Sequence, residues 1–280
     1  RDDVRLRYQL RRADGRIEGS GEAPARIPAV DSLPFGKIRV PGIEADERET
    51  AVLEAVLTDP DGEILASAAQ PFELFPETPP QLDRPVGVVG APDGPAGRLV
   101  ERLGARAETG ESALAESTLL VDGDAFEAHR DALEKAVVAG ARCVVLGLPE
   151  GCHTVADETV EVRPTAMRPR VFASRDTGHP AVADLHANDC KFWWDEDVGW
   201  ASPFVATVLE TGEDWIPILT AGNGDARRRQ AVTPTWHPYS AAAERRTADG
   251  GTWIVCQAEL HNRVRNNPAA ASLALGLLGK

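Results

Sequence analysis

The sequence has no tryptophan in its first 192 residues, and all six tryptophans lie between Trp193 and Trp253. Lysine is almost absent, so nearly all positive charge is arginine, and the net charge is −14. A phosphate backbone requires a basic face, so the charge argues against nucleic-acid binding. No run of about 20 apolar residues occurs, so we expect no membrane-spanning helix.

Cysteine is also scarce, and its spacing excludes the common metal patterns. The four cysteines form no CxxC pair and no zinc-finger spacing, so we expect no metal site and no cofactor. Cys143 and Cys256 lie in apolar runs, which favours buried, reduced thiols. A Cys152–Cys190 disulfide is an alternative to four free thiols.

The chain starts with Arg1-Asp2-Asp3, with neither an initiator methionine nor an apolar leader. We therefore expect an excised piece of a longer protein. Its localisation stays open, with the cytoplasm slightly favoured over secretion.

Residues 1–77 show a pattern of short strands. Apolar and polar residues alternate over 4–10 and 49–57, and Asp14-Gly15 and residues 58–62 give turn signals. Further strands are expected at 26–30, 36–40, 63–68 and 70–76. About six or seven strands without a helix predict a small Ig-like β-sandwich.

A Pro-rich linker at 78–83 separates this sandwich from a different pattern over 84–280. Apolar strands are expected at 85–90, 117–122, 142–147 and 252–257, with helices over 96–103, 125–139 and 268–278. Strands alternating with amphipathic helices predict a parallel sheet covered on both faces. The fold class is therefore multi-domain, a β-sandwich followed by a flavodoxin-like or amidotransferase-like α/β domain.

Two loops in residues 84–280 are candidate positions for a binding or catalytic site. Residues 90–94 follow the first strand but match no phosphate-binding motif, and Asp93 would repel phosphate. Cys152 follows the third strand, where a nucleophile could stand on a sharp turn. The bulky surroundings and the adjacent His153 make Cys152 an alternative nucleophile only, because neighbours on a strand point in opposite directions.

Histidines supply two further candidates. His179, His186 and Asp189 could gather at a metal, although histidines satisfied within a loop are commoner. His261 and Arg263 follow the last strand, where ligands bind in open α/β sheets. Capping of the terminal helix by Asn266 or Asn267 would explain part of that loop without a ligand.

The Trp-rich stretch is the most specific signal. Trp193, Trp194, Asp195 and Trp200 combine indole rings with carboxylates, which suits a surface that stacks on a sugar and accepts hydrogen bonds from its hydroxyls. A place in the core, or in a lid over the core, is the commoner alternative. Trp193, Trp194, Asp195, Trp200, His261 and Arg263 are therefore candidates for contacts with carbohydrate or with another domain.

Three segments together resemble the C-terminal region of family 2 glycoside hydrolases of the β-galactosidase type. They are the sandwich ending at 71–76, the run from His179-Pro180 to Trp194, and residues 251–270. The resemblance implies an accessory Ig-like domain and an amidotransferase-like domain appended to some bacterial glycosidases. The catalytic glutamates of that family lie on a (β/α)₈ barrel of about 250 residues, and no such pattern fits this chain.

The resemblance therefore predicts a non-catalytic accessory segment of a glycoside hydrolase, with no catalytic residue of its own. Its expected partner is the catalytic barrel of the parent chain, with carbohydrate or a second copy of the chain as further possibilities. The alternatives are an independent hydrolase or amidotransferase that uses Cys152, and a carbohydrate-binding module.

Overall fold

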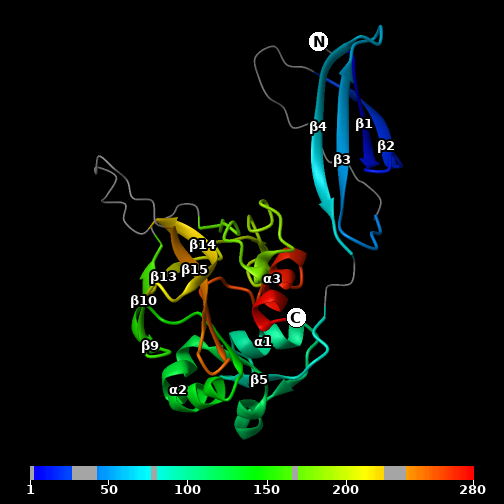
Figure 1. Ribbon diagram of the computed structural model, residues 1–280. Coiled ribbons are helices and arrows are strands. Elements are labelled where there is room, and N and C mark those ends of the chain that lie inside the picture. Colours follow the sequence, from blue (N-terminus) through cyan, green and yellow to red (C-terminus); the bar gives the residue numbers. More distant parts are fainter. Residues whose placement is uncertain (1–2, 27–42, 77–80, 166–169, 224–237) are drawn as a thin grey trace, which may run out of the picture. The chain divides into compact units, whose positions relative to one another are not determined.

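The computed structural model describes residues 3–26, 43–76, 81–165, 170–223 and 238–280. The chain divides into two compact units, Arg1–Thr78 and Pro79–Lys280, which are described separately. Both units are mainly β, and the second combines a curled mixed sheet with a few helices (Figure 1).

In the first unit, the described residues form one antiparallel sheet of four strands in the order β2-β1-β3-β4. Its strands are β1 (Val4–Arg12), β2 (Ile17–Ala25), β3 (Glu49–Thr58) and β4 (Ile64–Leu74). Gly15 and Gly62 adopt positive φ in the two hairpin turns, a conformation that glycine enters without steric cost. The turns expected near Gly15 and over 58–62 are thereby confirmed.

Two strand predictions for this unit need correction. The segments 63–68 and 70–76 form the single strand β4, because Pro71 does not interrupt pairing at a sheet edge. Strand β2 was not expected, since its glycines and Pro24 give no apolar alternation, and its pairing with β1 defines it instead. The strands expected at 26–30 and 36–40 lie outside the described residues, apart from Arg26.

The second unit contains a ten-stranded sheet, as far as its described residues show. One half is parallel, in the order β6-β5-β7-β8-β16. These strands are β5 (Val86–Val89), β6 (Ala107–Glu108), β7 (Thr118–Asp122), β8 (Arg142–Leu146) and β16 (Thr252–Cys256). The short apolar runs of β5, β7, β8 and β16 are typical of strands buried on both faces, and these four predicted strands are confirmed, whereas the two-residue edge strand β6 was not expected.

The other half of the sheet is antiparallel, which corrects the expectation of a parallel sheet. It contains β9 (Gly151–Val155), β10 (Glu158–Pro164), β13 (Thr207–Glu210), β14 (Ile216–Asn223) and β15 (Pro238–Arg246). Ala156 and Asp157 join β9 to β10 with positive φ at both positions. Tight hairpins usually place Asn or Gly there, so this turn gave no sequence signal.

Helices cover both faces of the sheet (Figure 1). They are α1 (Pro95–Arg102), α2 (Gly123–Val138) and α3 (Pro268–Leu278), with short 3-10 helices at Gly110–Ala115 and Pro180–Val182. Helices α1 and α3 share one apolar core, and α2 belongs to another. Successive strand residues alternate between the two cores, as Val144 and Val145 do, because strand side chains point to opposite faces. No helix of the described residues is long and apolar enough to cross a membrane.

Candidate functional site

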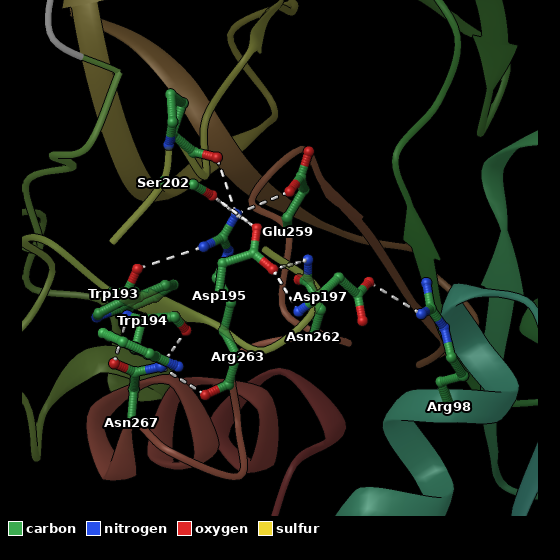
Figure 2. A network of polar contacts seen from close by, with 11 residues as sticks. Arg98, Trp193, Trp194, Asp195, Asp197, Ser202, Glu259, Asn262, Arg263 and Asn267 are labelled. Carbon is green, nitrogen blue, oxygen red and sulfur yellow. Dashed lines mark hydrogen bonds and ion pairs between the residues drawn. The ribbon is translucent and has the colours of Figure 1, made fainter. Parts of the chain in front are cut away.

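Arg263 lies at the centre of a polar network at the carboxyl end of β16, between that strand and α3 (Figure 2). Its side chain is fully buried. Nη2 donates to Asp195 Oδ2 at 3.1 Å and to Glu259 Oε2 at 2.9 Å. The same nitrogen lies 2.9 Å from Ser202 Oγ and 2.8 Å from the carbonyl of Pro203, while Nη1 donates to the carbonyl of Trp193 at 3.3 Å. A buried guanidinium requires such partners, because burial of an unpaired charge is costly.

Asp195 is the buried carboxylate of this network. Ser202 Oγ donates to Oδ2 at 2.6 Å, and Asn262 Nδ2 and the backbone N–H of Asp197 donate to Oδ1 at 3.0 and 2.9 Å. Burial alone would raise the pKa of Asp195, but these hydrogen bonds and the charge of Arg263 lower it below its ordinary value. Asp195 is therefore an ionised structural group, and it lies too deep to contact a ligand at the surface.

Asp195 belongs to a short hairpin, and the network around Arg263 holds this hairpin in place. Its strands are β11 (Trp194–Asp195) and β12 (Trp200–Ala201), and we call residues 192–201 the aromatic hairpin. Its side chains Phe192, Trp194, Val198 and Trp200 are 65%, 45%, 53% and 57% exposed. A large apolar surface exposed on a rigid element is a feature of interaction sites.

Asn267 fixes the backbone of Trp194 directly (Figure 2). Asn267 Oδ1 accepts from the Trp194 N–H at 2.9 Å, and Nδ2 donates to the Trp194 carbonyl at 2.8 Å. Nδ2 also donates to the carbonyl of Arg263 at 2.6 Å. Asn267 occupies the N-cap position of α3, but its side chain makes no cap hydrogen bond. The expected capping role is therefore replaced by a clamp on the hairpin.

Two ion pairs link the hairpin to α1. Arg98 Nη1 lies 3.2 Å from Asp197 Oδ2, and Arg102 Nη2 lies 3.0 Å from Glu196 Oε2. Arg102 also donates to the carbonyl of His261. The hairpin is thus held by α1, by the Arg263 segment and by the start of α3.

Phe192 opens the hairpin in a strained conformation. Its φ is 53°, in the left-handed region that a residue with a Cβ enters at a cost of roughly 1–2 kcal/mol. Its N–H donates to the carbonyl of Val171 at 2.9 Å, which holds the backbone in place while the ring faces solvent. Such strain is concentrated at functional positions of proteins.

The tryptophans of the run divide between core and surface. Trp193 is buried and stacks on Phe204, with ring centroids 4.2 Å apart, and its Nε1 donates to the carbonyl of Asp189 at 2.6 Å. The core interpretation therefore holds for Trp193, whereas Trp194 and Trp200 face solvent. Sequence alone could not separate the three, because both environments suit an indole ring.

The loop at 90–94 has no vacant anion site. Asp122, the last residue of β7, directs its carboxylate at the first turn of α1, where Oδ1 accepts from the N–H of Ala96 at 2.7 Å. A Cβ on Gly90 or Gly94 would lie 2.1 Å from Asp122 Oδ2, so these glycines are needed for the close approach. Burial raises the pKa of Asp122, and the backbone hydrogen bonds of Ala96 and Ala91 oppose this rise. The position that a phosphate would take is therefore filled by the chain's own carboxylate.

The cysteines offer little for nucleophilic catalysis. All four are free, and only Cys152 is exposed. Burial raises the pKa of Cys190 and of Cys256 to about 12, and it raises that of Cys143 further still. Cys152 lies within β9, opposite Glu161, rather than on a strand-to-helix turn. The neighbouring His153 bonds to the carbonyl of Pro149 and to Glu127, so its ring is occupied elsewhere.

His179, His186 and Asp189, the candidate metal ligands, do not form a cluster in the structure. Nδ1 of His179 accepts from the N–H of Ala181, and its Nε2 lies 3.6 Å from Glu244 Oε2 in the core. The backbone N–H of His186 donates to Asp189 at 2.7 Å, which closes a local turn. No three metal-ligating side chains gather within the described parts of the chain.

Neither a scan against protein-family models nor a search of the curated proteins finds a match for this chain. The proposed function therefore rests on the geometry of this chain's own residues. This geometry brings Asp195, Arg263 and the hairpin into one network, while His261 lies beside them and lines a separate cleft. Sequence reasoning did not identify Ser202, Asn262 or the clamp role of Asn267, since their roles depend on contacts across about 60 to 73 residues.

Proposed function

We propose that this chain is a non-catalytic accessory segment of a glycoside hydrolase, and that the aromatic hairpin forms its contact with the catalytic barrel of the parent protein. In this proposal the first unit is an Ig-like domain and the second an amidotransferase-like domain. Four antiparallel strands in one unit, and parallel strands with helices on both faces in the other, agree with that assignment.

The observation that carries the proposal is the combination of exposed rings with a fixed backbone. Trp194 and Trp200 expose about half of their surfaces, yet the hairpin between them is tied to buried Arg263 and to Asn267. Ordering the site before binding reduces the entropy lost on association. Aromatic side chains are also enriched at the centres of protein interfaces.

The register of the hairpin favours a protein partner over a sugar. Trp194 pairs with Ala201, and Trp200 pairs with Asp195. Directly opposed residues project to the same face, so Trp194 and Trp200 project to opposite faces. A flat platform for one sugar chain would need both rings on one face. Two rings on opposite faces form no such platform, whereas a protein surface can contact each exposed ring separately.

The alternative in which Cys152 is a nucleophile has weaker support. Cys152 pairs with Glu161 across the β9–β10 hairpin. The ring of the adjacent His153 is bonded to Glu127 and to the carbonyl of Pro149, so it is not free to act as a base. A reactive thiolate is normally stabilised by a nearby cation or a helix N-terminus. Cys152 has neither of these as a side-chain partner among the hydrogen bonds and ion pairs of the described residues.

The test measures association and turnover separately. The chain is assayed on a panel of aryl glycosides, and its binding to the barrel encoded in the same reading frame is measured by calorimetry. We expect no turnover by the chain alone, and we expect Trp194→Ala with Trp200→Ala to weaken binding at least tenfold, as for interface hot spots. Val138→Ala, which truncates an equally exposed apolar side chain on α2, is the matched control.

Three results would change this proposal. Hydrolysis by the isolated chain would overturn the non-catalytic assignment. Binding that is unaffected by loss of both rings would remove the hairpin from the interface. Self-association that depends on the same rings would replace the barrel by a second copy of this chain as the partner.

A further inference from the structure

A cleft of about 530 Å³ opens at the carboxyl edge of the parallel strands, within the range of ligand-binding clefts. The residue at or just after the end of each central strand lines it: Gly90 after β5, Asp122 at the end of β7, Gly147 after β8 and Gln257 after β16. This is the edge at which open α/β sheets bind ligands. The cleft is lined by none of the exposed side chains of the aromatic hairpin.

Hydrogen-bond donors face this cleft from the start of α2. Asp122 is the N-cap residue of this 16-residue helix, but its carboxylate bonds to α1, and α2 has no side-chain cap. Gly123, Asp124 and Ala125 of the first turn all line the cleft. The first N–H groups of a helix have no partner within the helix, so they are available as donors at this point.

His261 adds a neutral group to the lining of the cleft. Burial, followed by the charge of Arg98, lowers its pKa to about 4, so the imidazole is uncharged near pH 7. A neutral imidazole offers one donor and one acceptor. The lining of the cleft thus offers a further donor without a positive side chain.

Acceptors and apolar walls complete the lining. Asp124 and Glu259 are the acidic residues of the lining, and Glu259 also accepts a hydrogen bond from Arg263 through Oε2. No lysine or arginine is found among the described residues that line the cleft. These carboxylates disfavour an anionic ligand. Ala91, Pro95 and Leu260 supply apolar surface between the polar groups.

We propose that this cleft binds a small, neutral, polyhydroxylated molecule, namely a mono- or disaccharide. Each hydroxyl both donates and accepts, which matches a lining that combines helix N–H groups and a neutral imidazole with carboxylates. The C–H faces of such a molecule contact the apolar walls. This inference goes beyond the proposed function, because it concerns a different surface and does not depend on a barrel partner.

To test this proposal, the full chain is titrated at pH 7 with glucose, galactose and lactose, and binding is monitored by NMR and by calorimetry. Ala91→Phe places a ring in the exposed mouth of the cleft, and Asp124→Asn removes one charge-assisted acceptor. We expect saturable binding of at least one sugar, its loss in Ala91→Phe, and a weakening of roughly tenfold in Asp124→Asn. Asp131→Asn, an exposed change on the same helix away from the cleft, leaves binding unchanged.

The opposite results would overturn the proposal. Absence of binding by all three sugars, or binding that Ala91→Phe leaves intact, excludes a saccharide site in this cleft. Tighter binding of glucosamine than of glucose would show an amine site instead, and tighter binding of glucuronate would contradict the charge argument. Variants at Trp194 and Trp200 should bind sugar normally, which separates this proposal from the barrel interface.

Discussion

Replacement of Arg263 by methionine tests the network that holds the aromatic hairpin. The guanidinium is fully buried, and it contacts the buried carboxylate of Asp195 as well as Glu259. Loss of one partner from a buried ion pair typically costs about 3–5 kcal/mol, because the remaining charge stays buried without compensation. The share of Glu259 is small, since its side chain is 45% exposed and solvent screens the pair. We therefore expect Arg263→Met to lower the free energy of unfolding by about 3–5 kcal/mol.

Urea unfolding followed by tryptophan fluorescence measures this loss in the second unit alone. All six tryptophans lie between residues 193 and 253, so the first unit contributes no indole signal. Glu259→Gln is the matched control and should cost less than about 1 kcal/mol. The double variant Arg263→Met with Asp195→Asn should recover part of the loss, because both charges are then gone. A cost below about 1 kcal/mol for Arg263→Met would refute the reasoning.

Three further predictions follow from single residues. The pKa of Glu244 is lowered to about 2 by His179, Arg246 and Arg142, so its contribution to stability should be complete above pH 4.5 and lost as the pH falls toward 2. Glu244→Gln should therefore flatten the pH dependence of unfolding between these values, and an unchanged slope would contradict this assignment. Cys152 should be the only thiol labelled in the native chain, with four labelled in denaturant, as mass spectrometry would show. Fast labelling of a second thiol would contradict the burial of the other three. Phe192→Gly should leave the free energy of unfolding unchanged or raise it by up to about 1 kcal/mol, because glycine relieves the positive φ. A clear loss of stability would mean that the ring packs against the fold.

The elements with regular apolar patterns were predictable from sequence. Residues 86–89, 118–122, 142–146 and 252–256 form strands close to the expected bounds, and α3 begins at Pro268 as its N-terminal proline indicated. The antiparallel half of the sheet was missed because its pairing is non-local. Strand β10, for example, pairs with β13 about 50 residues later, and neither glycine nor asparagine marks the β9–β10 hairpin.

The candidate site could be located from sequence but not resolved into roles. The Trp-rich composition pointed to the segment that contains the aromatic hairpin, yet Trp193 is core, Asp195 is a buried ion and Trp194 is exposed. Neighbouring strand residues face opposite sides, so the surroundings of each one depend on packing across distant segments. Arg263 lies 68 residues from its partner Asp195, a separation at which no sequence spacing indicates contact.

The most direct test of the central claim compares two proteins in one assay, the 280-residue chain and the full product of the reading frame that encodes it. Both are given the same aryl glycosides under the same conditions. We expect turnover by the full product and none by the chain alone. Hydrolysis by the chain alone, or a full product that cleaves no glycoside, would contradict it.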